Sequence, residues 1–120
     1  LLTLTGRKNQ KKGEITNMKV FMAEGTELFN FVVALKNTGN IHFTPKGKVI
    51  IDRQNKEGEY KNIGETEFEE LSFPILPGDT RFLTATYPEK LEPGKYMLNV
   101  IIEGTDEPIK LQQELVFKYQ

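Results

Sequence analysis

The fold of this protein is decided by residues 28–36, which read LFNFVVALK. Every second residue of this stretch is large and apolar: Phe29, Phe31, Val33 and Leu35. Successive side chains of a β-strand point to opposite faces, so the pattern predicts a strand with one buried face.

The same period-two alternation recurs along the chain, and no window of comparable length keeps the spacing of an amphipathic helix. It predicts clear strands over Lys46–Arg53, Tyr96–Glu103 and Leu111–Tyr119, and weaker ones over Glu14–Met22, Thr66–Phe73 and Thr80–Tyr87. The side chains expected to face inward are Met18, Val20, Met22, Val49, Ile51, Phe68, Leu71, Phe73, Tyr96, Leu98, Val100, Ile102, Leu111, Leu115, Phe117 and Tyr119.

The gaps between these strands carry residues that favour turns. They are Asn37–Asn40, Asn55–Gly58, Pro77–Asp79, Pro93–Gly94 and Gly104–Asp106. Proline fixes its own φ and glycine accepts a positive φ, so both Pro-Gly pairs predict type II turns. Seven short strands separated by such turns are typical of a two-sheet sandwich.

A tyrosine corner is predicted within Leu91–Tyr96, with Leu91, Gly94 and Tyr96 as its structural residues. In immunoglobulin-like domains a tyrosine early in the sixth strand returns its hydroxyl to the backbone a few residues upstream. The alternative is a plain Pro-Gly turn before a buried aromatic. Leu98 then stands where antibody domains place a disulfide cysteine, with Phe31 or Val33 opposite. The expected fold is an all-β, immunoglobulin-like sandwich of about seven antiparallel strands in two sheets, without a disulfide.

The composition narrows the functional classes. The chain has 120 residues, enough for one core, and is 38% hydrophobic and 28% charged, as in a soluble globular domain. A net charge of -1 argues against a dedicated nucleic-acid binder. No apolar stretch is long enough to span a membrane. The absence of cysteine excludes disulfides, thiolate metal sites and cysteine nucleophiles, although it leaves the compartment open.

The residues that could carry catalysis lack partners. His42 is the only histidine, and Ser72, the only serine, falls in a predicted apolar strand without the glycines of a nucleophile elbow. We therefore predict that the protein is not an enzyme and has no catalytic residues and no cofactor. A metal site made by His42 with Asp52 or Asp79 is the sharper alternative, but such a site needs several converging ligands.

Two groups of carboxylates invite other readings. Asp79, Asp106 and Glu107 lie in predicted loops and could bind calcium, but they lack a recognisable calcium-loop spacing, so we assign no metal site. The acidic stretch could suggest paired carboxylates for glycoside hydrolysis, but its alternation favours a solvated edge strand. Its members are Glu57, Glu59, Glu65, Glu67, Glu69 and Glu70, broken by Lys61.

Residues 1–12 are predicted to be a linker or the trailing strand of a preceding domain, with the sandwich spanning residues 13–120. Gly6–Gly13 would be the flexible part. The alternative is that Leu1–Thr5 adds an edge strand to this domain. The basic residues here are expected to be solvated, with an anionic polymer or lipid as the alternative partner: Arg7, Lys8, Lys11 and Lys12.

The feature that most suggests binding is an apolar set on the outward face of the sheet formed by the third, sixth and seventh predicted strands. Its members are Ile50, Met97, Ile101 and Val116. If they are contiguous, they form a docking face for a protein or a neighbouring domain, unless a loop covers them. An exposed edge strand offers a second route, by strand addition.

Three segments resemble the immunoglobulin-like domains of bacterial envelope proteins, of the pilus-chaperone-like and WxL-associated types. They are residues 33–47, 75–81 and 91–96, and the resemblance spans about residues 13–120. It implies a non-catalytic, extracytoplasmic spacer or protein-binding module in a longer exported chain. The basic pair with which pilus chaperones anchor a subunit carboxylate is not identifiable here.

The sequence therefore predicts a structural or adhesive module of a bacterial surface protein, with a protein partner or an adjacent domain, no nucleic acid, and no membrane span in this segment. The alternative is a carbohydrate-binding accessory module of a secreted enzyme, with cell-wall carbohydrate as a ligand. That function requires exposed, coplanar aromatic side chains. The candidates are Tyr60, Tyr87 and Phe43.

Overall fold

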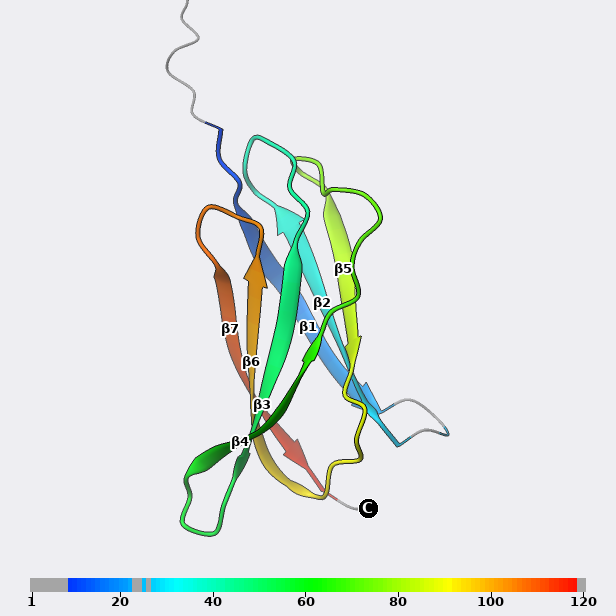
Figure 1. The fold of residues 1–120 in the computed structure, drawn as a ribbon, viewed down its shortest axis with the longest axis vertical. Helices are drawn as coiled ribbons and strands as arrows, with labels where there is room; N and C mark the ends of the chain where they lie inside the picture. The colour runs from blue at the N-terminus through cyan, green and yellow to red at the C-terminus, as the bar shows by residue number, and fades with distance from the viewer. Residues whose placement is uncertain (1–8, 23–24, 26, 119–120) are drawn as a thin grey trace, which may run out of the picture.

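The computed structural model describes residues 9–22, 25 and 27–118. Seven strands run through this part of the chain (Figure 1): β1 (Gly13–Met22), β2 (Phe29–Asn37), β3 (Lys46–Gln54), β4 (Tyr60–Glu67), β5 (Thr80–Thr86), β6 (Gly94–Glu103) and β7 (Ile109–Phe117). No helix that could cross a membrane is found among the described residues. The predictions for Leu1–Thr5, Gly6, Arg7, Lys8 and Tyr119 fall outside the described residues.

The strands form two antiparallel sheets that lie one behind the other in Figure 1. One sheet has three strands in the order β1-β2-β5, and the other has four in the order β4-β3-β6-β7. Successive strands run up and down the long axis, so the loops gather at the two ends. The predicted all-β sandwich of seven antiparallel strands in two sheets is confirmed.

Alternate residues of β2, β3 and β6 fill the space between the sheets, as predicted. Each fully buried aliphatic or aromatic side chain contributes about 1.5–3 kcal/mol, so these strands supply most of the hydrophobic stabilisation. The inward-facing apolar residues of the three strands that are buried are Phe29, Phe31, Val33, Leu35, Val49, Ile51, Tyr96, Leu98, Val100 and Ile102. All but Phe29 of these have 0% of their surface exposed.

The inward side chains of β1 and β7 are less well buried than those of β2, β3 and β6. Met18 and Val20 of β1 pack against the core, as expected, but Met22 lies at the end of the strand and is 37% exposed. The inward residues of β7 are half-buried and lean on the core from its margin; they are Ile109, Leu111, Leu115 and Phe117.

The predicted strand over Thr66–Phe73 is wrong. The fourth strand is Tyr60–Glu67, and the chain leaves its sheet at Phe68: the N–H of Phe68 bonds Gly47 in β3 at 2.9 Å, whereas the next N–H, of Glu69, bonds Thr84 in β5 at 2.8 Å. Phe68 is buried, but Phe73 is 70% exposed, and Ser72 lies exposed in a bend and not in an apolar strand.

The two Pro-Gly pairs differ. Gly78 has a φ of 87°, and the N–H of Asp79 donates to the carbonyl of Leu76 at 2.9 Å, which is the type II turn that the sequence predicts. The prediction of the same turn at Pro93–Gly94 is wrong, because Gly94 has no positive φ and begins β6.

One buried polar side chain organises the loops at the end where β2 stops. Asn37 is only 1% exposed, and its amide nitrogen donates to the carbonyls of Ile41 at 3.0 Å and Ile75 at 2.8 Å. Its amide oxygen accepts the N–H of Gly39 at 2.9 Å. Three hydrogen bonds therefore satisfy this amide and tie β2 to two separate loops.

The segment that precedes β1 is bonded to the same end. The carbonyl of Lys12 accepts two N–H groups from the turn after β2, and Gln10 exchanges hydrogen bonds with Asn40. Lys11 exchanges two more with Asp106 in the loop before β7. The side chains of Lys11 and Lys12 are exposed, as expected, and the backbone over residues 10–12 is hydrogen-bonded to the sandwich.

We expect Asn37→Ala to lower the free energy of unfolding by about 2–4 kcal/mol, because it removes three hydrogen bonds and leaves a cavity at a buried position. Urea denaturation measures the change. Asn37→Asp should cost at least as much, because a carboxylate cannot donate to the two carbonyls.

Thr38→Ala is the matched control, since Thr38 is the exposed neighbour and only its backbone is bonded. It should change stability by less than about 0.5 kcal/mol. Equal effects of Asn37→Ala and Thr38→Ala would contradict the role given to the buried amide.

Candidate interaction surfaces

The four apolar residues predicted to form a docking face all lie on the outer face of the four-stranded sheet. Ile50 comes from β3, Met97 and Ile101 come from β6, and Val116 comes from β7. Val116 is 47% exposed, and the other three are half-buried. No loop therefore covers them fully.

The four do not stand side by side across the ladder. Their directly opposite neighbours are all polar: Asn99 and Glu65 for Ile50, Asp52 and Glu114 for Met97, Lys48 and Lys110 for Ile101, and Lys95 for Val116. They are neighbours only on diagonals, which long side chains can still bridge. Apolar and polar side chains therefore alternate across this face, and the apolar ones do not form one continuous patch.

A row of hydrogen-bonded side chains crosses all four strands through the middle of this face. Asn62 donates to one oxygen of Asp52 at 3.2 Å, and Asn99 donates to the other at 3.4 Å. Gln112 in turn donates to Asn99 at 3.1 Å. We call Asn62, Asp52, Asn99 and Gln112 the polar row.

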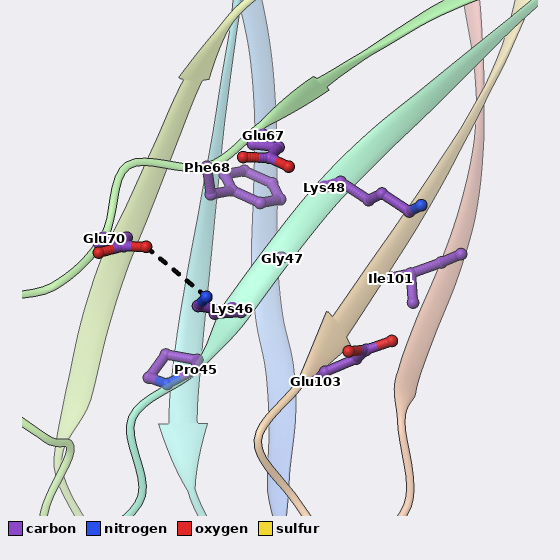
Figure 2. A pocket seen from close by; sticks show the side chains of 9 residues that line it. All are labelled: Pro45, Lys46, Gly47, Lys48, Glu67, Phe68, Glu70, Ile101 and Glu103. Atoms are coloured by element: carbon purple, nitrogen blue, oxygen red, sulfur yellow. Dashed lines mark ion pairs between the residues drawn. The ribbon is translucent and has the colours of Figure 1, made fainter.

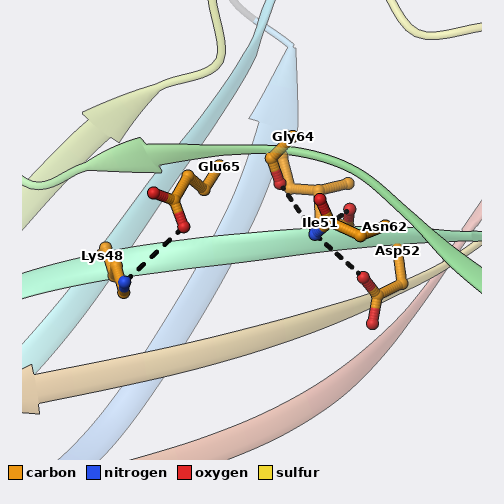
Figure 3. Close-up of polar contacts among 6 residues, drawn as sticks. All are labelled: Lys48, Ile51, Asp52, Asn62, Gly64 and Glu65. Atoms are coloured by element: carbon orange, nitrogen blue, oxygen red, sulfur yellow. Dashed lines mark hydrogen bonds and ion pairs between the residues drawn. The ribbon is translucent and has the colours of Figure 1, made fainter.

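Figure 3 shows the β3–β4 end of the polar row. The amide of Asn62 also lies 3.5 Å from the carbonyls of Ile51 and Gly64, so it sits at the β-bulge between these strands. Beside it, Lys48 and Glu65 form an ion pair at 3.6 Å, which contributes little because both side chains are exposed to water. The row thus orders the polar groups of this face, with their side chains held in place by one another.

A hollow of about 230 Å³ opens at the end of the same sheet where β3 begins (Figure 2). Phe68 lies between its walls, and Lys46 and Glu70 face each other across it at 3.8 Å. The charged residues on its rim are Lys46, Lys48, Glu67, Glu70 and Glu103. The rim mixes both signs, so the hollow selects neither an anion nor a cation.

At the predicted corner, the hydroxyl of Tyr96 donates to the backbone carbonyl of Glu92, four residues upstream. Arg53 of β3 stacks over the Tyr96 ring at 5.8 Å and donates to the carbonyl of Pro93 at 3.3 Å. Leu91 packs against the core, and Gly94 opens β6. This is the geometry of a tyrosine corner, and it fixes the crossing from one sheet to the other.

Among the described residues, no group of three or more histidine, aspartate and glutamate side chains could hold a metal ion. His42 is exposed in the loop before β3, whereas Asp52 belongs to the polar row. Asp106 is engaged with Lys11, and the backbone of Asp79 closes a turn. The alternative metal sites raised for these residues are therefore not assembled in this structure.

The acidic stretch is divided between two elements. Glu57 and Glu59 lie exposed at the β3–β4 hairpin, where the side chain of Asn55 accepts both of their N–H groups. Glu65 and Glu67 lie exposed on β4, which is an edge strand of its sheet. The predicted solvated edge strand is therefore confirmed for Glu65 and Glu67 but is wrong for Glu69 and Glu70, which lie beyond the end of β4.

The aromatic residues proposed as a sugar-binding platform are not on the surface together. Phe43 is 2% exposed and Tyr87 is 4% exposed, so both belong to the core, and Tyr60 is half-buried on β4. Phe43 forms a β-bridge with Ile75. The hydroxyl of Tyr87 donates to the carbonyl of Ile63 at 3.3 Å.

The sequence reasoning missed two exposed aromatic residues on the outer face of the three-stranded sheet. Phe82 of β5 is 64% exposed and lies opposite Ala34, and Phe21 of β1 is 48% exposed and lies opposite Asn30. Val32 stands between them on the central strand. The signal was available, since Phe21 and Phe82 fall out of phase with the buried residues of their strands.

The strand order and the tyrosine corner define an immunoglobulin-like β-sandwich, here without the disulfide of antibody domains because the chain has no cysteine. The sequence matches no known protein family and no curated protein. Solved structures share the fold at low identity, so the likeness concerns the fold alone.

One similar structure is the alkylpurine DNA glycosylase AlkC of Pseudomonas fluorescens bound to DNA with an abasic site analogue, at a TM-score of 0.57 and 15% identity over 91% of this chain. Another is the CARDB domain of the PF1109 protein of Pyrococcus furiosus in complex with di-metal ions, at 0.53 and 15%, over 93% of this chain and 99% of that one. A third is β-glucosidase 3B of Thermotoga neapolitana in complex with glucose, at 0.55 and 14% over 91% of this chain. This chain spans 32% of the AlkC chain and 17% of the glucosidase chain.

The tyrosine corner predicts an alkaline limit to stability. Burial raises the pKa of Tyr96 above its ordinary value, with Glu92 adding to the rise and Arg53 opposing it. The folded state therefore favours the neutral phenol. This stabilisation is complete below the unfolded pKa of about 10 and is lost as the pH rises through the folded value.

We expect Tyr96→Phe to cost about 1 kcal/mol at neutral pH, because it deletes one hydrogen bond. The variant should also lose less stability than the wild type when the pH is raised above 10, which denaturation at a series of pH values will measure. Tyr60→Phe, at a half-buried position on β4, is the control for the loss of a tyrosine hydroxyl at neutral pH. Identical profiles for wild type and Tyr96→Phe would show that the corner does not set the limit.

Proposed function

We propose that this domain is a non-catalytic structural or adhesive module of a larger bacterial surface or envelope protein. It binds a partner protein or a neighbouring domain through a sheet face or an edge strand. The observation that carries the proposal is the outer face of the four-stranded sheet, where Ile50, Met97, Ile101 and Val116 surround the polar row.

The chemistry of this face suits a protein partner. Protein interfaces mix apolar contacts with oriented hydrogen bonds, whereas sites for small molecules are concave. A partner that covers these apolar side chains removes them from water, which lowers the free energy of the complex. Val116 is the most exposed of them. The polar row presents amide groups whose orientation is already fixed, which lowers the entropy cost of meeting a partner.

The context of the fold supports a module in a longer protein. Domains of this fold occupy small fractions of the AlkC and glucosidase chains. The bacterial envelope and the extracytoplasmic location come from the sequence resemblance over residues 33–47, 75–81 and 91–96. In such a protein the domain acts as a spacer that also offers a binding surface.

Site-specific photo-crosslinking in the native cell tests the binding role. A photoreactive residue at Met97 should form a covalent adduct with one defined partner or neighbouring domain, identified by mass spectrometry. Phe82, on the opposite sheet, reports whether that face is used instead. Lys56 at the tip of the β3–β4 hairpin is the control position and should give no matching adduct.

A second variant separates binding from chance proximity. Val116→Lys, introduced beside the photoreactive residue at Met97, should reduce the adduct severalfold, because it places a charge in the middle of the contact. An epitope inserted at the Lys56–Gly58 tip should be accessible on intact cells or after release of the envelope. Recovery of the parent protein only in the cytosol, or adducts equal to those of the control position, would refute the proposal.

A further inference from the structure

The sandwich has four edge strands, and three of them are either covered by another segment or interrupted by a bulge. An unpaired edge exposes backbone N–H and C=O groups that can add another strand. The edges are β1 and β5 of the three-stranded sheet and β4 and β7 of the other.

β5 is covered by the chain that links it to β4, because the carbonyl of Thr84 accepts the N–H of Glu69 and that of Thr86 accepts the hydroxyl of Thr66, each at 2.8 Å. β1 is interrupted by a bulge between Ile15 and Asn17, and β4 by a bulge opposite the step from Ile51 to Asp52. Bulges of this kind disrupt the ladder and discourage edge-to-edge association.

β7 is the exception. It pairs with β6 through nine consecutive residue pairs, from Gly94–Phe117 to Ile102–Ile109, without a shift of register. In the described part of the chain no strand pairs with its other edge, and Figure 1 shows β7 at the margin of its sheet. Its inward side chains are only half-buried, unlike those of β6. The edge is therefore regular, open and incompletely covered.

The side chains of β7 are complementary to themselves. Lys110 and Glu114 lie on the outer face, two residues to either side of Gln112, and both are exposed. Among the described residues, neither takes part in an ion pair closer than 4 Å. If two copies of β7 meet antiparallel with Gln112 opposite Gln112, each Lys110 faces a Glu114 of the other copy.

The same register also fits the polar row and, apart from Leu111 opposite Gln113, the inner face. It places Ile109 opposite Leu115 of the second copy, which would cover two half-buried side chains. It joins the two polar rows, because Gln112, at the end of each, would meet the amide of the other Gln112. A register centred on Gln113 would instead put Lys110 opposite Val116.

We infer that β7 is a homophilic pairing edge, at which a second copy of this chain adds antiparallel to form a continuous eight-stranded sheet with Gln112 on the two-fold axis. The contact is isologous, so a single surface serves both copies and closes the assembly as a dimer. This inference rests on the edge-strand route of the proposed function and names its partner. The form of recognition is strand addition.

Charge reversal tests the register. The wild-type chain should show a concentration-dependent monomer–dimer equilibrium in sedimentation experiments from micromolar to millimolar concentration. Glu114→Lys places a lysine opposite Lys110 of the other copy at both ends of the contact, so it should weaken the dimer by about tenfold or more. Lys110→Glu should do the same by placing two glutamates opposite each other. The double variant K110E/E114K restores opposite charges and should recover wild-type association.

Matched variants control for net charge. Glu57→Lys and Lys56→Glu make the same changes at the exposed β3–β4 hairpin and should leave association unchanged. Thermal unfolding of each variant verifies that the domain remains folded, which the exposure of Lys110 and Glu114 leads us to expect.

Cysteine cross-linking gives an independent readout, since the chain has no cysteine of its own. Gln112→Cys places two thiols directly opposite each other and should give a disulfide-linked dimer under mild oxidation. Gln113→Cys should not, because in this register its thiols are offset along the strands. Lys56→Cys is the control for random collision.

A wild-type chain that stays monomeric throughout the concentration range overturns the inference, and so does a dimer that is indifferent to Glu114→Lys or is not restored by the double variant. Preferential cross-linking through Gln113→Cys overturns the register. None of these results affects the adduct expected at Met97, so a failure here is distinguishable from a failure of the proposed function.

Discussion

The buried side-chain amide of Asn37 is the interaction on which the loop end of the sandwich depends. Two sheets pressed together by apolar side chains would still leave their connecting loops free, because the hydrophobic effect has no direction. Asn37 supplies direction by holding the carbonyls of Ile41 and Ile75 and the N–H of Gly39. The positions of Phe43 and of the segment before β1 follow from it, since both are bonded to the same loops.

Much of this fold was predictable because burial is periodic. In β2 and β6 the alternation is uninterrupted, and every residue assigned to the core is there. The fourth strand was misplaced because its sequence conflicts with its position: Tyr60–Glu67 contains few large apolar residues, whereas Phe68, Leu71 and Phe73 beyond it attract the pattern. The position of this polar strand depends instead on a close tertiary contact between Gly64 and Tyr87. A β-carbon on Gly64 would lie 2.4 Å from the Tyr87 hydroxyl, a contact between residues far apart in sequence.

The candidate surfaces were predictable only in part, for a related reason. Alternation places Met97 and Ile101 on the outer face, but only the register between strands reveals that Ile50 lies opposite Asn99 and diagonal to both of them. The polar row needs three such registers to be known at once. The tyrosine corner, by contrast, lies within one segment, so local spacing was sufficient to predict the role of Tyr96, although the acceptor, the carbonyl of Glu92 four positions upstream, was not named in advance.

The direction in which the strands run has a mechanical consequence. β1 begins at one pole of the long axis, and β7 ends at the other (Figure 1). Tension applied along that axis through these two strands would load the β1–β2 and β6–β7 ladders in shear, with many hydrogen bonds resisting together instead of unzipping singly. A domain with this geometry is suited to transmitting force between two attachment points at opposite ends of its long axis.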